Sequence, residues 1–250
     1  MERVSFINKK GQNISGLIFE DKNKALNTVV IVCHGFTGSK EGHGKAVEMA
    51  EFLLKNGYAC LLFDFAGCGE SGGKFEDISL SSHIEDLSRA VDFCLKKGFS
   101  RIVTLGRSFG GTTAICQAAA DQRVGGVCTW AAPASLIDLF MGFTDEELPD
   151  AESSLVTLAG DDGIIFLKKS FFTDLSVHDV LKCSPLVSQR PLLVVQGTRD
   201  DVVPPEEAQA IFNSAGDPKE LFYVEGADHQ FSAHHTVVWN ILLEWLNKHF

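Results

Sequence analysis

The chain has 250 residues, of which 45% are hydrophobic, and this length fits one large α/β domain better than two small ones. Its 33 acidic residues outnumber its 22 basic residues, which gives a formal net charge of −11. Because nucleic acids and anionic membranes are bound through basic faces, this balance argues against both as partners. We therefore expect a single domain spanning 1–250.

The seven cysteines form an odd set without a C-x-x-C pair and without the spacing of a metal site. Most lie inside apolar runs, such as Cys33 in VVIVC, where a free cysteine behaves as a small hydrophobe. The segment MERVSFINKKGQNISG has no uninterrupted apolar stretch, and no run approaches the roughly 18 residues of a membrane span. The expectation is a cytoplasmic protein that is neither secreted nor embedded in a membrane.

From residue 28 onward, short β-branched runs alternate with helical patterns, which is typical of a mostly parallel sheet with helices on both faces. Eight strands are predicted, at 3–7, 14–20, 28–33, 59–64, 101–106, 126–130, 191–196 and 219–224. The first two precede any helix, so we expect an antiparallel entry hairpin. Helices are predicted at 43–56, 81–97, 109–120, 205–213 and 236–248, where apolar residues recur at three- and four-residue steps.

An insertion interrupts this alternation at about 134–184. About fifty residues stand there, where the fold needs only a short connection before the next strand. The segment combines charged residues with the apolar runs LIDLFMGF and IIFLKKSFF, so we expect it to form helices of its own. An apolar face beside the carboxyl edge of a sheet commonly serves as a lid or binding wall, and we expect that role here.

The pentapeptide GRSFG at 106–110 follows the strand RIVTL and precedes the helical run TTAICQAAA. In this strand–turn–helix context, glycines remove the Cβ atoms that would collide around a serine in a strained backbone conformation. The pattern alone also occurs in ordinary turns, but the preceding strand favours a nucleophile. Ser108 is therefore the predicted nucleophile.

The strand VVIVC runs directly into His34, Gly35 and Phe36, which places a turn at the carboxyl end of a neighbouring strand. Acyl transfer needs backbone amides that donate to the tetrahedral oxyanion. The N–H group of Phe109, which follows the serine, is one predicted donor, and that of Phe36 is the other. The side chain of His34 is expected only to shape the turn.

The general base is expected in a loop after a late strand, and GADH at 226–229 follows ELFYV and precedes the last helix. His229 is the predicted base, because neutral imidazole near pH 7 accepts the serine proton and returns it to the leaving group. His234 and His235 are less favoured, since they begin the final helix. The orienting acid is expected in GTRDDVVP at 197–204, directly after the strand PLLVVQ.

Taken in order, the motifs HGF, GRSFG, GTRDDVVP and GADH resemble those of the α/β-hydrolase superfamily over nearly the whole chain. The resemblance implies an α/β-hydrolase fold with the chain order Ser, Asp, His. In the superfamily pattern G-x-x-D-x-x-V-P the acid lies four residues before the proline. Counting back from Pro204 gives Asp200, so Asp201 is expected to be a turn or surface residue.

Within the superfamily, HGFTGSK, DFAGCGESGG and the insertion after the sixth strand resemble the small bacterial cinnamoyl (feruloyl) esterases and their carboxylesterase relatives. Ala66 stands where many members carry an arginine. Those enzymes hold an aromatic acyl group with the inserted segment. Asp138 is a candidate polar contact for substrate there, with a solvated or capping Asp as the alternative.

The resemblance implies serine-dependent hydrolysis of a small-molecule carboxylic ester, with a short or aromatic acyl group, through an acyl-enzyme. Serine peptidases and thioesterases use the same triad and remain alternatives. A ligand-binding protein that only kept the fold would be expected to have a broken triad. No dinucleotide cofactor is expected, because the turn at Gly67 and Gly69 lacks the full G-x-G-x-x-G pattern. No metal is expected, because neither the cysteines nor the carboxylate-rich runs have metal-ligand spacing.

Overall fold

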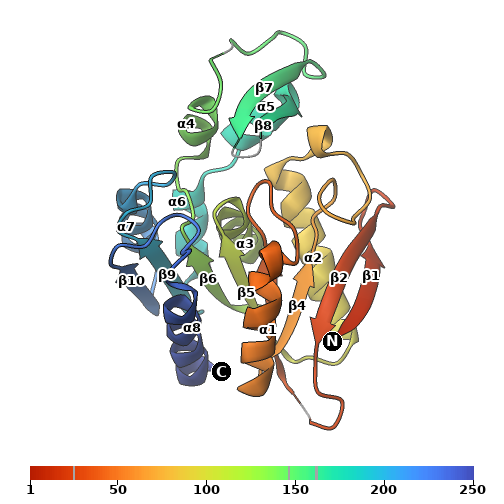
Figure 1. Ribbon diagram of the computed structural model, residues 1–250, viewed down its shortest axis with the longest axis vertical. Helices are drawn as coiled ribbons and strands as arrows, with labels where there is room; N and C mark the ends of the chain where they lie inside the picture. Colours follow the sequence, from red (N-terminus) through yellow and green to blue (C-terminus); the bar gives the residue numbers. More distant parts are fainter. Residues whose placement is uncertain (25, 146, 161–162) are drawn as a thin grey trace.

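The computed structural model describes residues 1–24, 26–145, 147–160 and 163–250, and within these ranges eight strands form one sheet (Figure 1). They are β1 (Glu2–Ile7), β2 (Asn13–Phe19), β3 (Thr28–Cys33), β4 (Ala59–Phe63), β5 (Arg101–Arg107), β6 (Val124–Trp130), β9 (Leu192–Gly197) and β10 (Lys219–Val224). The predicted eight-stranded sheet is confirmed: the strands at 28–33 and 219–224 have the predicted ends, and the ends of the other six differ by at most two residues.

The sheet has the order β1-β2-β4-β3-β5-β6-β9-β10. The β1–β2 and β2–β4 pairs are antiparallel, and all other pairs are parallel. The chain runs from β3 outward to β4 and then crosses back to β5, so the order reverses between β3 and β5. In open α/β sheets, ligands bind outside the carboxyl ends of the strands at such a reversal.

Helices cover both faces of the sheet, as predicted (Figure 1). On one face lie α1 (Lys45–Lys55) and α8 (His235–His249), and on the other lie α2 (Leu80–Lys96), α3 (Phe109–Ala120) and α7 (Pro205–Ser214). Successive residues of a strand point to opposite faces, so Val29 and Ile31 join one buried cluster and Val30 joins the other. Among the described residues, no helix combines the length and apolarity needed to cross a bilayer.

Most of the insertion lies beyond the carboxyl edge of the sheet, at the top of Figure 1, whereas its last helix, α6 (Val180–Cys183), lies beside α3. The insertion also contains α4 (Leu136–Met141), the antiparallel pair β7 (Leu155–Gly160) and β8 (Gly163–Lys168), and α5 (Lys169–Ser176). The helices were predicted, whereas the hairpin was not. The run IIFLKKSFF divides between β8 and α5, because a short apolar run is compatible with either structure.

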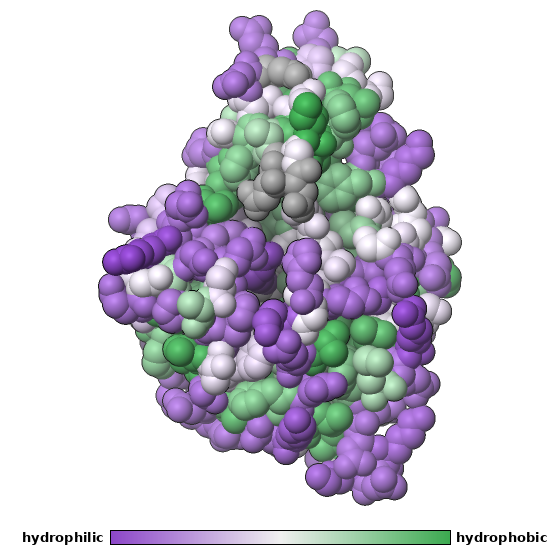
Figure 2. Space-filling model, in the orientation of Figure 1, coloured by the Kyte–Doolittle hydropathy of each residue, from purple (hydrophilic) through white to green (hydrophobic). Residues whose placement is uncertain are grey.

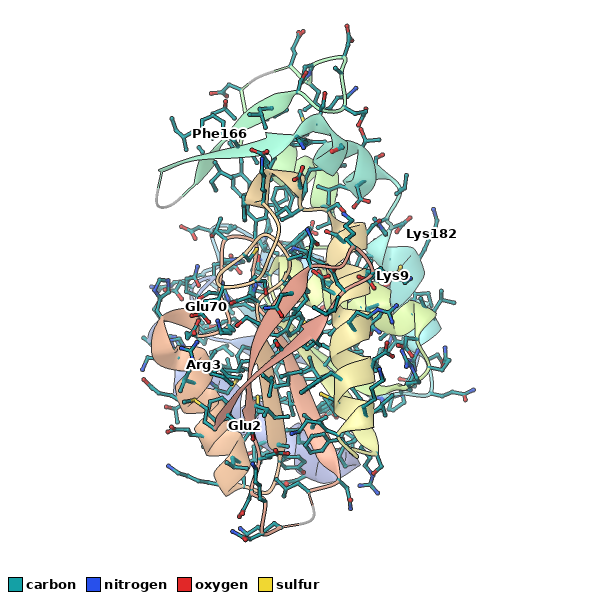
Figure 3. All side chains as sticks on the ribbon, turned by 90° about the vertical axis from the view of Figure 1, so that its right-hand side faces the viewer. Glu2, Arg3, Lys9, Glu70, Phe166 and Lys182 are labelled. Atoms are coloured by element: carbon teal, nitrogen blue, oxygen red, sulfur yellow. The ribbon has the colours of Figure 1, made fainter. Side chains whose placement is uncertain are left out.

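The hairpin buries one face and exposes the other. Val156, Leu158 and Leu167 are buried, whereas Ile164 and Phe166 on the opposite face are 69% and 52% exposed. Figure 3 shows Phe166 projecting outward from the hairpin, and Figure 2 shows apolar surface gathered on the insertion. The insertion therefore presents apolar surface to solvent as well as to the core.

Polar contacts fasten both ends of the insertion to the main domain. A Glu207 carboxylate oxygen, in the first turn of α7, accepts hydrogen bonds from the backbone N–H groups of Ala134 and Ser135, each at 2.7 Å. Near the other end, Asp174 of α5 accepts from the backbone N–H of Ser81 at 3.0 Å. These contacts tie the insertion to α7 and α2.

Asp86 is a fully buried carboxylate of α2. Its two oxygens accept hydrogen bonds from the Asn8 side chain and from the Ala66 N–H, each at 2.8 Å. Burial outweighs these hydrogen bonds and raises the pKa of Asp86 to about 6.

This raised pKa predicts a pH-dependent stability. The folded state binds the Asp86 proton more tightly than the unfolded chain, so the contribution is fully present below the unfolded pKa and is lost as pH rises through about 6. Between about pH 7 and pH 5, the free energy of unfolding should therefore rise by about 1 kcal/mol more in the wild type than in Asp86→Asn. Urea unfolding of both proteins across this pH range measures the difference. Their other carboxyl groups are the same, so the contributions of those groups to the pH dependence cancel. Parallel pH profiles would contradict the prediction.

Candidate active site

Ser108 occupies a strained turn between β5 and α3. Its backbone lies at φ 53° and ψ −127°, a conformation that residues with a Cβ rarely adopt. The Ser108 N–H donates to the Trp130 carbonyl at 2.8 Å, which ties the turn to β6. A Cβ atom at Gly106 would lie 2.1 Å from the Gly110 carbonyl oxygen, and one at Gly110 would lie 2.4 Å from that of Cys33. Both glycines are thus required by close backbone packing around the serine.

Asp200 and His229 lie in the loops after β9 and β10 and contact each other. Oδ2 of Asp200 is 2.9 Å from Nδ1 of His229, and both residues are only 7% exposed. The Asp200 carboxylate also accepts from the backbone N–H groups of Val202 and Val203, at 3.0 and 2.8 Å. The neighbouring Asp201 is exposed.

The two loops pack backbone against backbone. A Cβ atom at Gly197 would lie 2.3 Å from the Ala227 carbonyl oxygen, which accepts a hydrogen bond from the Arg199 N–H at 3.0 Å. The Gly226 N–H donates to the Thr198 hydroxyl at 2.8 Å. This packing holds the carboxylate and the imidazole at hydrogen-bonding distance.

The electrostatics of the pair set the tautomer of His229. Burial raises the pKa of Asp200, but the hydrogen bond and charge of His229 and the two backbone amides together hold it below its ordinary value. The ionised carboxylate can only accept, so His229 donates through Nδ1–H, and in the neutral form of the ring Nε2 is then the acceptor. In the described part of the chain, no hydrogen bond joins the Ser108 hydroxyl to His229; such contacts commonly tighten only when substrate binds.

The predicted oxyanion donors lie at neighbouring strand ends, Phe36 after β3 and Phe109 after β5. Phe109 is the first residue of α3, where backbone N–H groups have no partner within the helix and the helix dipole favours negative charge. Among the described residues, neither the Phe36 N–H nor the Phe109 N–H donates to a protein acceptor. Both groups can therefore donate to a bound oxygen.

Four phenylalanine rings connect these residues to the insertion. Phe140 of α4 lies 4.8 Å from Phe36, 5.5 Å from Phe109 and 4.9 Å from Phe171 of α5, measured between ring centroids. Phe109, Phe140 and Phe171 are buried, whereas Phe36 is partly exposed. The Phe109 ring therefore supports the site from within the core, and only Phe36 of this pair can present its ring to a ligand.

Asp138 is exposed in the first turn of α4, where its carboxylate accepts from the Ser135 hydroxyl at 2.6 Å. Its exposure is what is expected of a solvated Asp, and its contact with substrate stays a prediction. Sequence reasoning did not single out Phe140 or Phe171, whose rings contact those of Phe36 and Phe109. Across the described ranges, no group of three or more His, Cys, Asp or Glu side chains is arranged to hold a metal ion.

Structural comparison finds close similarity to Est1E from Butyrivibrio proteoclasticus with ferulic acid bound. The TM-score is 0.86 at 25% identity, and the match covers 98% of each chain. The α/β-hydrolase domain-containing protein 10 from mouse gives a TM-score of 0.79 at 18% identity and covers 99% of each chain, a likeness of fold alone.

Sequence relatives include the uncharacterised protein YfhR of Salmonella typhi, 24% identical over 240 residues that cover 91% of this chain and 74% of that protein. The human mitochondrial palmitoyl-protein thioesterase ABHD10 is 27% identical over 207 residues, which cover 80% of this chain and 65% of that protein. The family model described as alpha/beta hydrolase fold matches residues 28–160, more than half of the chain. The chain therefore belongs to the α/β-hydrolase fold family.

Proposed function

We propose that the protein is a serine hydrolase that cleaves carboxylic esters with short or aromatic acyl groups. The observation that carries this proposal is the buried Asp200–His229 pair, at the same carboxyl edge of the sheet as the strained turn of Ser108. The N–H groups of Phe36 and Phe109 complete the set of groups that acyl transfer requires. Family membership and its esterase and thioesterase neighbours support hydrolytic activity.

The proposed reaction proceeds through an acyl-enzyme. Oγ of Ser108 attacks the ester carbonyl carbon while Nε2 of His229 takes its proton, and Asp200 stabilises the resulting imidazolium. The N–H groups of Phe36 and Phe109 donate to the oxyanion. The tetrahedral intermediate collapses as His229 returns the proton to the leaving alcohol. Water then attacks the acyl-enzyme by the same route and releases the acid.

An aromatic acyl group is favoured by two observations. Est1E, similar to this chain over nearly its whole length, binds ferulic acid. The partly exposed ring of Phe36 contacts the rings of Phe140 and Phe171 of the insertion. Aromatic rings in offset or edge-to-face contact bind one another favourably. We infer that the acyl group packs against the exposed part of the Phe36 ring, beside the insertion.

A thioester is the second candidate substrate. The human relative ABHD10 is a palmitoyl-protein thioesterase, and the same attack by Ser108 cleaves a thioester with a thiol as leaving group. The exposed apolar face of the hairpin, with Ile164 and Phe166, offers surface for a longer acyl chain.

A panel of ester, thioester and amide substrates tests whether the protein is an esterase, a thioesterase or a peptidase. We expect kcat/KM for methyl ferulate or p-nitrophenyl butyrate to exceed that for palmitoyl-CoA by at least about tenfold, or about 1.4 kcal/mol in transition-state binding. A peptide anilide should not be cleaved. Ser108→Ala serves as the background for each substrate. Turnover of palmitoyl-CoA with both esters inert would assign the thioesterase function instead.

A further inference from the structure

The peptide unit between Gly35 and Phe36 is held by its carbonyl oxygen. The Gly35 oxygen accepts a hydrogen bond from the Gly38 N–H at 3.0 Å and lies 2.7 Å from Nδ1 of His34. A trans peptide is planar, so its C=O and N–H groups point in opposite directions. The groups that bind the Gly35 carbonyl therefore determine where the Phe36 N–H points.

The neighbours of His34 define which ring nitrogen carries the proton. The backbone N–H of Phe65 donates to Nε2 of His34 at 3.2 Å. Because a backbone N–H can only donate, Nε2 is unprotonated, and Nδ1–H is the donor to the Gly35 carbonyl. His34 is buried, and burial lowers its pKa, which keeps the ring neutral. Both ring nitrogens are thus used within the fold.

Ion pairs also hold the loop that carries Phe36, on the C-terminal side of that residue. The Lys40 ammonium is buried and lies 2.7 Å from Asp64 and 2.8 Å from Glu70, in the loop that follows β4. Asp64 also accepts from the Lys40 backbone N–H at 2.7 Å. On the outer side, Glu70 pairs with Arg3 of β1, and Figure 3 shows these two side chains together. The loop that carries Phe36 is therefore attached to the loop after β4 on both sides of that residue.

We propose that His34, as the neutral Nδ1–H tautomer, is a positioning residue that orients the Phe36 N–H toward the substrate oxyanion. The proposal rests on the proposed function of Ser108 and extends it, because the ring nitrogens of His34 contact Gly35 and Phe65, and His34 would act on the oxyanion only through the Gly35–Phe36 peptide. Without the Nδ1–H donor, the Gly35–Phe36 peptide keeps only the hydrogen bond from Gly38. The peptide can then rotate, and a carbonyl oxygen turned toward the site repels the oxyanion.

Two substitutions at His34, compared with each other, test the contribution of the hydrogen bond from Nδ1–H to the Gly35 carbonyl. Both His34→Asn and His34→Leu remove the Nε2 acceptor of the Phe65 N–H, but only Asn keeps an N–H donor near the position of Nδ1. We expect His34→Leu to lower kcat by about 10²- to 10³-fold, the effect of losing one oxyanion donor, with KM changed less than about threefold. We expect His34→Asn to retain kcat within about tenfold of the wild type. The rate of Ser108 labelling by a fluorophosphonate should follow the same ranking.

Thermal unfolding of each variant shows whether the comparison is made between folded proteins. Equal kcat values in the two variants, or a rise in KM with kcat unchanged, would overturn the role of His34. If His34→Leu does not fold, ¹⁵N NMR of histidine-labelled wild-type protein decides: a protonated Nδ1 on a neutral His34 supports the proposal, and a protonated Nε2 overturns it. Turnover by Ser108→Ala at the wild-type rate would instead remove the proposed function, and this inference with it.

Discussion

Ser108→Ala is expected to lower kcat for p-nitrophenyl acetate by at least about 10⁴-fold, because no acyl-enzyme forms without Oγ. The fold should persist, since Ala keeps the Cβ atom and the backbone hydrogen bond from residue 108 to Trp130 is unchanged. The backbone strain at φ 53° is therefore similar in both proteins. Steady-state kinetics and a thermal melt of the purified variant measure the two parts of this expectation.

The exposed Ser153 of the insertion supplies a matched control, because Ser153→Ala removes a hydroxyl from a surface position. That variant should keep wild-type turnover. A fluorophosphonate should label the wild type at Ser108, as located by peptide mass spectrometry. Labelling at another residue, or turnover by Ser108→Ala above about one per cent of wild type, would contradict the assignment of the nucleophile.

The sheet was predictable because helices cover both of its faces. Its central strands are therefore short apolar runs, and such runs can be recognised in the sequence. Runs such as TVVIVC in β3 are rich in β-branched residues, which favours a central strand. The β7–β8 hairpin was not predictable in this way. Its stability depends on packing Val156 and Leu167 against the helices of the insertion, a tertiary contact that local patterns do not encode.

The candidate site was likewise predictable only in part. Motif context predicted which loops carry Ser108, Asp200 and His229, because each follows a strand of the parallel sheet. The roles of Lys40 and His34 depend on partners distant in sequence, the Asp64 carboxylate and the Phe65 N–H. Lysine is rarely buried unless it is paired, so nothing local to HGFTGSK indicates a buried ammonium.

Contacts between residues distant in sequence also bring the predicted loops side by side. The β3–β5 reversal brings the Phe36 loop beside Ser108, and the aromatic cluster then joins both to the insertion. Movement of α4 or α5 would be transmitted to the predicted oxyanion donors through rings in direct contact. Under the proposed function, the insertion would therefore influence acyl binding and oxyanion stabilisation together.

The adjacent carboxylates Asp200 and Asp201 are expected to differ by orders of magnitude in their effect on turnover. Asp200 is buried against Nδ1 of His229, whereas Asp201 is exposed. Replacing the orienting acid with Asn keeps its shape but favours the wrong imidazole tautomer, and in a serine protease the equivalent substitution lowers kcat by about 10⁴-fold. We therefore expect a loss of about 10³- to 10⁴-fold for Asp200→Asn and less than about tenfold for Asp201→Asn.

The pH dependence of the same variants separates a catalytic loss from a folding defect. Asp200 has a depressed pKa, so its stabilising contribution is present above its unfolded pKa and is lost as pH falls through the lower folded value. Asp200→Asn should therefore lose stability relative to the wild type at neutral pH, with the difference shrinking only under strongly acidic conditions. Urea unfolding of the wild type and both variants, at neutral and at acidic pH, tests the stability effect, and kcat at neutral pH tests the catalytic effect. A larger loss of kcat in Asp201→Asn would move the orienting acid to Asp201, and near-wild-type kcat in both variants would remove this loop from the mechanism.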